Sequence, residues 1–153
     1  TPVEETGKLL ETLNRGFDIV IGSRGLRDSQ VQVHQSIARE TMGKVFNLMI
    51  RLFLPLEFRD TQCGFKMFTR AAAEVILQRM QINGFAFDVE MLMIGKELDL
   101  HICEMPVVWR NVRESKVHPI RNSMEMIRDL LKIRRRLKAG ELNHKESKQE
   151  SQP

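Results

Sequence analysis

The sequence predicts an α/β fold in which helices flank an incomplete sheet. One sign is the apolar, β-branched segment 17–22, which follows a helical segment ending at Gly16. Strands that are covered on both faces have such continuous apolar runs. The other sign is the alternation of strand-like segments with helical periodicity along the rest of the chain. The 153 residues, 42% hydrophobic and 29% charged, have the length and composition of one globular domain with a real core.

Each expected element follows from its hydrophobic spacing and from the residues that start or stop it. In chain order we expect helices over 3–15, 37–54, 70–80, 89–98 and 119–138, strands over 17–22, 65–69 and 101–109, and a loop over 23–35. Thr1, followed by Pro2, is expected to cap the first helix, and Asp88 the fourth. Pro106 favours an edge position or a bulge for the last strand. The polar segment 139–153 is expected to be a disordered tail.

Two of these helices are amphipathic, and the last one is also basic. The helix over 37–54 is expected to bury Ile37, Val45, Leu48, Met49, Leu52 and Phe53. The apolar stripe of the helix over 119–138 consists of Ile120, Met124, Ile127, Leu130, Leu131 and Leu137. Its positive charges, within eleven residues, are Arg128, Lys132, Arg134, Arg135, Arg136 and Lys138. Such a cluster indicates an anionic partner, which can be phosphate, a lipid surface or nucleic acid.

Composition excludes several classes of protein. The two cysteines, Cys63 and Cys103, are too few for a disulfide framework or a four-thiolate zinc site. No apolar run approaches the ~20 residues that span a bilayer, and the first residues have no signal-peptide pattern. The chain itself is therefore expected to be soluble. Because it starts at Thr1 on a helix cap, without an initiator Met, we expect it to be part of a longer protein.

The densest group of polar candidate residues is the segment 60–66, Asp-Thr-Gln-Cys-Gly-Phe-Lys, just before an expected strand. Asp60 can act as a base, orient a nucleophile or accept a hydrogen bond from a sugar hydroxyl. The alternative is a loop carboxylate bonded to its own backbone. Gln62 can present a neutral donor. Cys63 has no His partner nearby in the sequence to activate its thiol, so we do not expect it to be a nucleophile.

Positive side chains near the expected strand ends are candidate phosphate ligands. Arg24 follows the strand over 17–22, and ligands of open α/β sheets bind at such carboxyl ends. Its guanidinium can bind phosphate through two parallel hydrogen bonds, although a solvated loop Arg is the alternative. Arg39, near the start of the next helix, could converge on the same anion. Trp109 leads into a basic segment with Ser115 and Lys116, which can close over a phosphate or remain a solvated charge run.

These segments together resemble a known family. The residues concerned are Ile21–Arg24, Arg39, Phe46 and Asn47, 60–70, 85–90, Pro106 and Val107 with Trp109, 115–117, and the last helix with Met126, 129–131, Ile133 and Arg134. In this order they resemble the later part of a family-two glycosyltransferase of the GT-A fold. The branch is that of the polyprenyl-phosphate and dolichyl-phosphate β-glucosyltransferases, and the resemblance covers about residues 1 to 138.

The resemblance implies an inverting transfer of a hexose from a nucleotide-sugar, with UDP-glucose favoured, to polyprenyl phosphate. Asp60 and Gln62 would then be catalytic. The phosphate or substrate ligands would be Arg24, Arg39, Ser115 and Lys116. The residues at the membrane surface would be Arg128, Lys132, Arg134, Arg135 and Arg136. Glu114, where relatives often have Gly, departs from this pattern and adds negative charge beside the proposed phosphate site.

The resemblance also implies a Mg or Mn ion, bound by an Asp-x-Asp motif that would fall just before Thr1. We therefore expect no metal site within this chain and little activity from it alone. The expected location is the cytoplasmic face of a membrane, either the bacterial inner membrane or the endoplasmic reticulum. Two alternatives remain. The same fold could serve another acceptor, a polysaccharide or a lipid. A non-catalytic basic module could bind anionic membrane or nucleic acid, although the nearly balanced charge elsewhere argues against nucleic acid.

Overall fold

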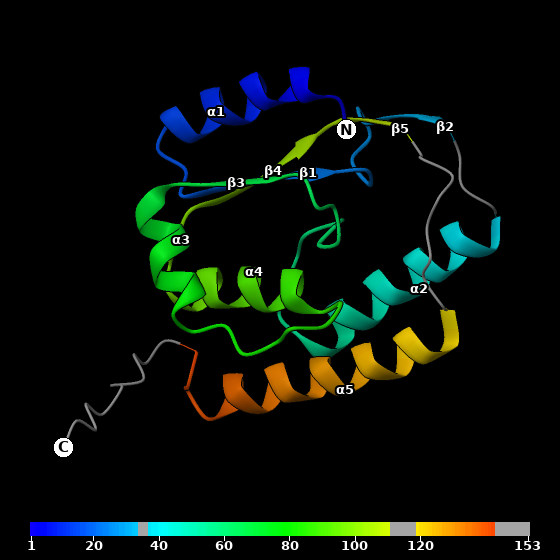
Figure 1. The fold of residues 1–153 in the computed structure, drawn as a ribbon, viewed down its shortest axis with the longest axis vertical. Coiled ribbons are helices and arrows are strands. Elements are labelled where there is room, and N and C mark those ends of the chain that lie inside the picture. Colours follow the sequence, from blue (N-terminus) through cyan, green and yellow to red (C-terminus); the bar gives the residue numbers. More distant parts are fainter. Residues whose placement is uncertain (34–36, 111–118, 143–153) are drawn as a thin grey trace.

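The computed structural model describes residues 1–33, 37–110 and 119–142 (Figure 1). Its elements are a 3-10 turn Val3–Glu5, α1 Thr6–Asn14, β1 Ile19–Ser23, β2 Gln30–Val33, α2 Ile37–Phe53, β3 Lys66–Phe68, α3 Arg70–Leu77, α4 Phe87–Glu97, β4 Ile102–Pro106, β5 Val108–Arg110 and α5 Pro119–Lys138. The mixed α/β class with a small open sheet is thus confirmed, and each expected helix and strand overlaps an observed one.

The central feature is a three-stranded sheet in the order β3-β1-β4. β1 pairs antiparallel with β3 and parallel with β4. Every residue of β1 is buried, as its continuous apolar sequence predicts. Helix α1 covers one face of the sheet and α4 the other; α5 lies beyond α4, and α2 lies to the side of α4 and contacts α5 (Figure 1). Gly95 permits the close approach of α4, because a Cβ there would lie 2.8 Å from Ile19 Cδ1.

A second, two-stranded sheet occupies part of the segment that we expected to be a loop. β2 pairs in parallel with β5, and Gln30 N donates to Val107 O over 3.2 Å. The expected single strand over 101–109 is therefore two strands in two sheets. The chain leaves the first sheet at Pro106, which has no N–H to donate. Among the described strands β4 is an edge strand, which confirms the expectation from Pro106.

Two expected helix caps are wrong. The first helical turn begins after Pro2, with no side-chain cap. Helix α4 begins at Phe87 after an uncapped Ala86. Asp88 lies inside its first turn, where its carboxylate accepts a hydrogen bond from Lys66 Nζ over 2.6 Å. The Asp88 side chain therefore forms an ion pair with Lys66, which lies 22 residues earlier in the chain, and does not cap the helix. Gly16 does end the first helical segment as expected, with a φ of 101° that suits glycine.

The buried side of α2 differs from the expected one. Val45, Leu48 and Leu52 are 51%, 57% and 71% exposed, whereas Ile50 and Leu54 are buried. The sequence of α2 has apolar residues on two sides, and hydrophobic spacing does not tell which side meets the core. In α5 the core residues are Leu130 and Ile133, while Met124, Ile127 and Leu131 are exposed. Both helices therefore have a second, solvent-facing apolar stripe.

The expected disordered tail begins too early. Beyond α5, Gly140 N and Glu141 N donate to the carbonyl oxygens of Leu137 and Arg136. Leu142 is fully buried and belongs to the core cluster. Residues 139–142 therefore fold back against the core, with Leu142 as the buried apolar side chain. Residues 143–153 lie outside the described part of the chain.

Candidate functional site

The centre of the candidate site is an ion pair between Arg24 and Asp60. Arg24 follows β1, and Asp60 lies in the connection from α2 to β3. Arg24 Nε donates to Asp60 Oδ2 over 2.6 Å, and Nη2 donates to Oδ1 over 2.9 Å. The backbone N–H of Arg24 also donates to Oδ2, over 3.0 Å. This is the bidentate geometry in which guanidinium and carboxylate bind most strongly.

Burial and charge fix the protonation state of the pair. Asp60 is 2% exposed. Its burial raises the pKa of the carboxyl, but hydrogen bonds and the charge of Arg24 outweigh this and lower the net pKa. The pKa of Arg24 is raised by its hydrogen bond to Asp60. The ionised pair therefore stabilises the fold above the ordinary pKa of an Asp. This contribution is lost only as the pH falls through the lowered pKa of Asp60.

Two further side chains hold the pair from other directions. The guanidinium carbon of Arg24 lies 5.4 Å from the ring centroid of Trp109, on β5, within the range of a cation–π contact. Glu104, on β4, accepts the backbone N–H of Asp60 over 2.9 Å. The sequence draws attention to Trp109, which leads into a basic segment, but not to Glu104. Nothing in its local sequence distinguishes it from an ordinary strand carboxylate.

Two other polar side chains of the 60–66 segment, Gln62 and Lys66, form hydrogen bonds that hold the loop in place. Gln62 Nε2 donates to Phe85 O over 3.2 Å. Lys66 Nζ donates to both Cys63 O and Asp88, each over 2.6 Å. Burial raises the pKa of the Cys63 thiol, which favours the unreactive protonated form. The segment is therefore held to Phe85 and Asp88 outside it, and the pair of Asp60 with Arg24 remains the charged centre of the site.

The other predicted site residues are placed as follows. Arg39 lies in α2, but its side chain is outside the described part of the chain, as are Ser115 and Lys116. Arg128, Lys132 and Arg135 are exposed on α5. Arg134 is partly buried, with its guanidinium carbon 5.7 Å from the ring centroid of Phe53 on α2.

Arg136 is a correction to the expected basic surface. Its side chain is only 11% exposed and forms an ion pair with Glu90, which is fully buried. Arg136 Nη2 also donates to Arg79 O over 2.8 Å. The charge therefore connects α5 to α4 and to the end of α3 instead of facing a membrane. Adjacent residues of an α-helix point about 100° apart, so Arg136 can face the core while Arg135 faces solvent.

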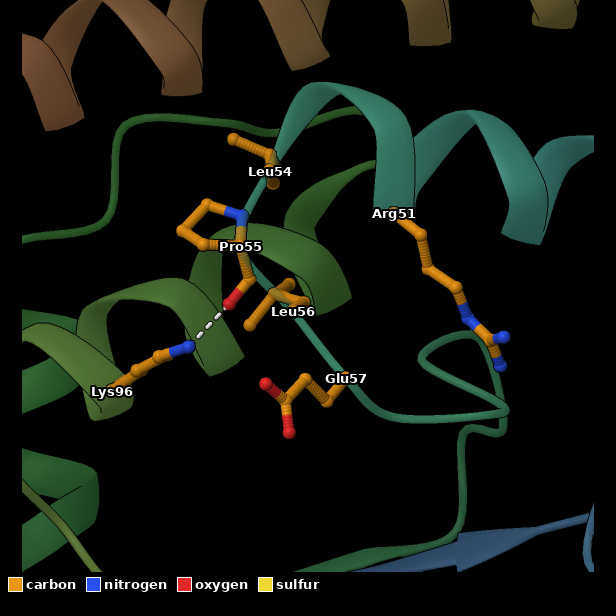
Figure 2. A pocket seen from close by; sticks show the side chains of 6 residues that line it. All are labelled: Arg51, Leu54, Pro55, Leu56, Glu57 and Lys96. Atoms are coloured by element: carbon orange, nitrogen blue, oxygen red, sulfur yellow. Dashed lines mark hydrogen bonds between the residues drawn. The ribbon is translucent and has the colours of Figure 1, made fainter.

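A pocket of about 380 Å³ lies elsewhere, between the end of α2 and α4 (Figure 2). It is lined by Arg51, Leu54, Pro55, Leu56, Glu57 and Lys96. Figure 2 shows Lys96 Nζ directed at the carbonyl oxygen of Pro55, to which it donates a hydrogen bond. Neither Arg24 nor Asp60 lines this pocket, so it is separate from the candidate site.

Among the described residues, no three His, Cys, Asp or Glu side chains come together in a group suited to a metal ion. No helix in the same ranges combines the length and the apolar character needed to cross a bilayer.

Comparison with known proteins agrees with the sequence resemblance. No family model matches the chain. The chain is 37% identical over 123 residues to a dolichyl-phosphate β-glucosyltransferase of Dictyostelium discoideum, covering 80% of this chain and 38% of that protein. Identity to the enzyme of the same name from Homo sapiens is 34%, covering 80% and 38%. For that of Saccharomyces cerevisiae it is 33%, covering 76% and 35%.

The similarity extends over most of this chain but over less than half of each relative. The chain spans about two fifths of the length of these curated relatives. The resemblance inferred from the 60–70 segment and its companions is confirmed, since the chain is similar to several dolichyl-phosphate β-glucosyltransferases over most of its own length.

Proposed function

We propose that this chain forms part of a GT-A-fold transferase that moves glucose from UDP-glucose to dolichyl phosphate. The names of its relatives support this reaction, and the Arg24–Asp60 pair is the observation that carries it to this chain's own residues. Asp60 uses two of the five N–H donors of the Arg24 guanidinium. Among the described contacts the other three donors are unused, and the side chain is 31% exposed. They suit a phosphate, because two of its oxygens can accept two parallel N–H bonds from a guanidinium.

The proposed chemistry does not need Asp60 to remove a proton. A phosphate monoester is already an anion at neutral pH, so its attack on the sugar requires orientation and charge neutralisation. Asp60 is ionised and buried, and both of its carboxylate oxygens accept from Arg24, which suits a residue that holds a cation in place. Its proposed role is therefore to position Arg24, which in turn holds the acceptor or donor phosphate. Gln62 keeps the loop against Phe85 in the same arrangement.

The resemblance implies that the ligands of a divalent cation lie upstream of this chain, and the proposed roles of Arg24 and Asp60 do not depend on that ion. Arg39, Ser115 and Lys116 remain proposed phosphate ligands. A different acceptor, such as a polysaccharide or another lipid, would use the same Arg24–Asp60 centre.

The test is transfer by the full-length protein. It is incubated with radiolabelled UDP-glucose and dolichyl phosphate, and the labelled lipid is quantified. We expect glucosylated dolichyl phosphate, and less product from dolichol, which lacks the phosphate. GDP-mannose is tested as the alternative donor, and a polysaccharide is tested as the alternative acceptor. Labelling only of the polysaccharide would contradict the proposed acceptor, and no labelling of any acceptor would contradict the transferase itself.

We also propose that α2 and α5 contact the membrane that carries the acceptor. Each helix has an exposed apolar stripe: Val45, Leu48 and Leu52 on α2, and Met124, Ile127 and Leu131 on α5. Both stripes have the spacing i, i+3, i+7, which places their three side chains on one face of the helix. Exposed basic residues accompany them: Arg51 on α2, and Arg128, Lys132 and Arg135 on α5. Apolar stripes beside positive charge suit a bilayer surface with anionic headgroups.

This membrane proposal predicts weaker vesicle binding when either component is removed. Leu48→Ser with Leu52→Ser should lower the partition coefficient onto phosphatidylcholine–phosphatidylserine vesicles by about tenfold or more, since each Leu contributes about 1.5–3 kcal/mol when fully buried. Arg135→Glu should lower it for anionic vesicles more than for neutral ones. The measurement is vesicle sedimentation. The matched control is Leu10→Ser, an exposed Leu on α1 at the opposite face of the sheet. Equal losses in control and test variants would contradict the proposal.

A further inference from the structure

The segment from β4 to β5 contacts the Arg24–Asp60 pair twice, from two directions. Glu104 on β4 reaches the backbone of the Asp60 loop: Oε1 accepts the N–H groups of Arg59 and Asp60, each over 2.9 Å. Five residues later, the ring of Trp109 lies against the guanidinium of Arg24. One carboxylate therefore fixes the loop that holds the Arg, and one ring fixes the Arg itself.

These two contacts restrain different motions of the guanidinium. The bidentate hydrogen bonds of Asp60 lie in the guanidinium plane and fix its in-plane rotation. The Trp109 ring, whose centroid lies 5.4 Å from the guanidinium carbon, limits movement of the guanidinium toward the ring. The Asp60 carboxylate can hold the guanidinium in place only if the backbone of Asp60 is itself fixed. Glu104 fixes that backbone by accepting the N–H of Asp60.

The supporting segment is itself firmly placed. Glu104 lies opposite Ile21 in the parallel β1–β4 pairing, and Trp109 lies opposite Val31 in the β2–β5 pairing. Between them Val107 is buried against Gly22, where a Cβ would come within 2.8 Å of Val107 Cγ1. The side chains of Glu104 and Trp109 therefore start from backbone that is paired on both sides of the transition between the two sheets.

We propose that Glu104 and Trp109 are positioning residues that hold Arg24 ready for an anionic group. Holding a long side chain before binding removes the loss of rotamer freedom that binding would otherwise involve. The order of Arg24 follows from the geometry alone. The identification of the anion as the phosphate of the transferase reaction rests on the proposed function.

The first measurement needs no substrate and no activity. Hydrogen exchange at Arg24 Nε–Hε is followed by NMR in the full-length protein, and the signal is assigned with Arg24→Lys. Trp109→Leu and Glu104→Ala should each accelerate exchange by about fivefold or more, as expected for loss of a contact of this kind. Trp109→Phe keeps an aromatic face, and Glu104→Gln keeps an oxygen acceptor. Both should restore exchange to within about twofold of the original protein.

The second measurement is steady-state transfer to dolichyl phosphate. Trp109→Leu and Glu104→Ala should raise KM for the acceptor more than they lower kcat, and the conservative variants should recover it. Glu57→Ala, an exposed carboxylate earlier in the same loop, is the matched control. It should change neither exchange nor KM. Should Trp109→Leu unfold, Trp109→Met keeps most of the volume without the ring face.

The two proposals fail in different ways. Unchanged Arg24 exchange in folded Glu104→Ala and Trp109 variants would overturn the positioning role, whatever the activity. Altered exchange in the variants, with no transfer by the unsubstituted protein, would leave the positioning role standing and overturn the proposed reaction. Faster exchange in Glu57→Ala of the same size would also overturn the assignment to Glu104, because it would reflect general loosening of the loop.

Discussion

Arg24→Ala and Asp60→Asn should each lower kcat/KM for transfer to dolichyl phosphate by roughly 10²–10³-fold, the cost typical of losing one preorganised donor to developing charge. Arg24→Ala removes the guanidinium directly. Asp60→Asn keeps the size of the side chain but replaces one acceptor oxygen by an N–H₂ group, which cannot accept from Arg24. The guanidinium then loses its fixed place without a large change in packing.

The measurement is steady-state kinetics of the full-length protein, with circular dichroism to show that each variant is folded. Arg27→Ala is the matched control, because Arg27 lies three residues further along the same loop and is exposed. It should retain near-normal turnover. Near-normal turnover in both Arg24→Ala and Asp60→Asn would remove this pair from the site. A loss in Asp60→Asn that Arg24→Ala does not share would return Asp60 to a direct role in the chemistry.

Arg136→Ala should lower the free energy of unfolding by about 3–5 kcal/mol, because it leaves the fully buried carboxylate of Glu90 without its charge partner. Glu90 also accepts the backbone N–H groups of Gln81 and Ile82, over 3.0 and 2.8 Å. The ion pair thus connects α5 to α4 and to the 79–82 segment. Loss of the Arg136 bond to Arg79 O adds to the effect.

Urea unfolding followed by circular dichroism measures this loss. Arg135→Ala is the control, since Arg135 is the adjacent residue of the same charge but is exposed. Its effect should stay within about 0.5 kcal/mol, as is usual for surface substitutions. If Arg136→Ala and Arg135→Ala lower the free energy of unfolding equally, Arg136 is a surface residue, as the sequence predicts, and is not buried with Glu90. Because Arg136→Ala is expected to destabilise the fold, vesicle-binding experiments should substitute the exposed Arg135 instead.

The faces of the two amphipathic helices show where sequence reasoning stops. The extent of α2 and α5 followed from hydrophobic spacing and from Pro55 and Pro119. The burial of Ile50 in place of Leu48 did not, because α2 has apolar residues on two sides. Which side meets the core depends on α4 and α5, which come later in the chain. For this reason Val45, Leu48 and Leu52, which we expected to be buried, are exposed and are now proposed to contact a membrane.

The sequence by itself determined the α/β class, the buried strand β1, the helices and the segment 60–70 whose family resemblance the comparisons confirm. These features depend on residues close together in the chain, through periodicity, helix stops and a local motif. Only the tertiary structure decided that Arg24 and Asp60 are partners, that Glu104 and Trp109 support them, and that Arg136 is buried with Glu90. Those contacts join residues from 36 to 85 positions apart. Their formation depends on strand register and helix packing, which no local pattern encodes.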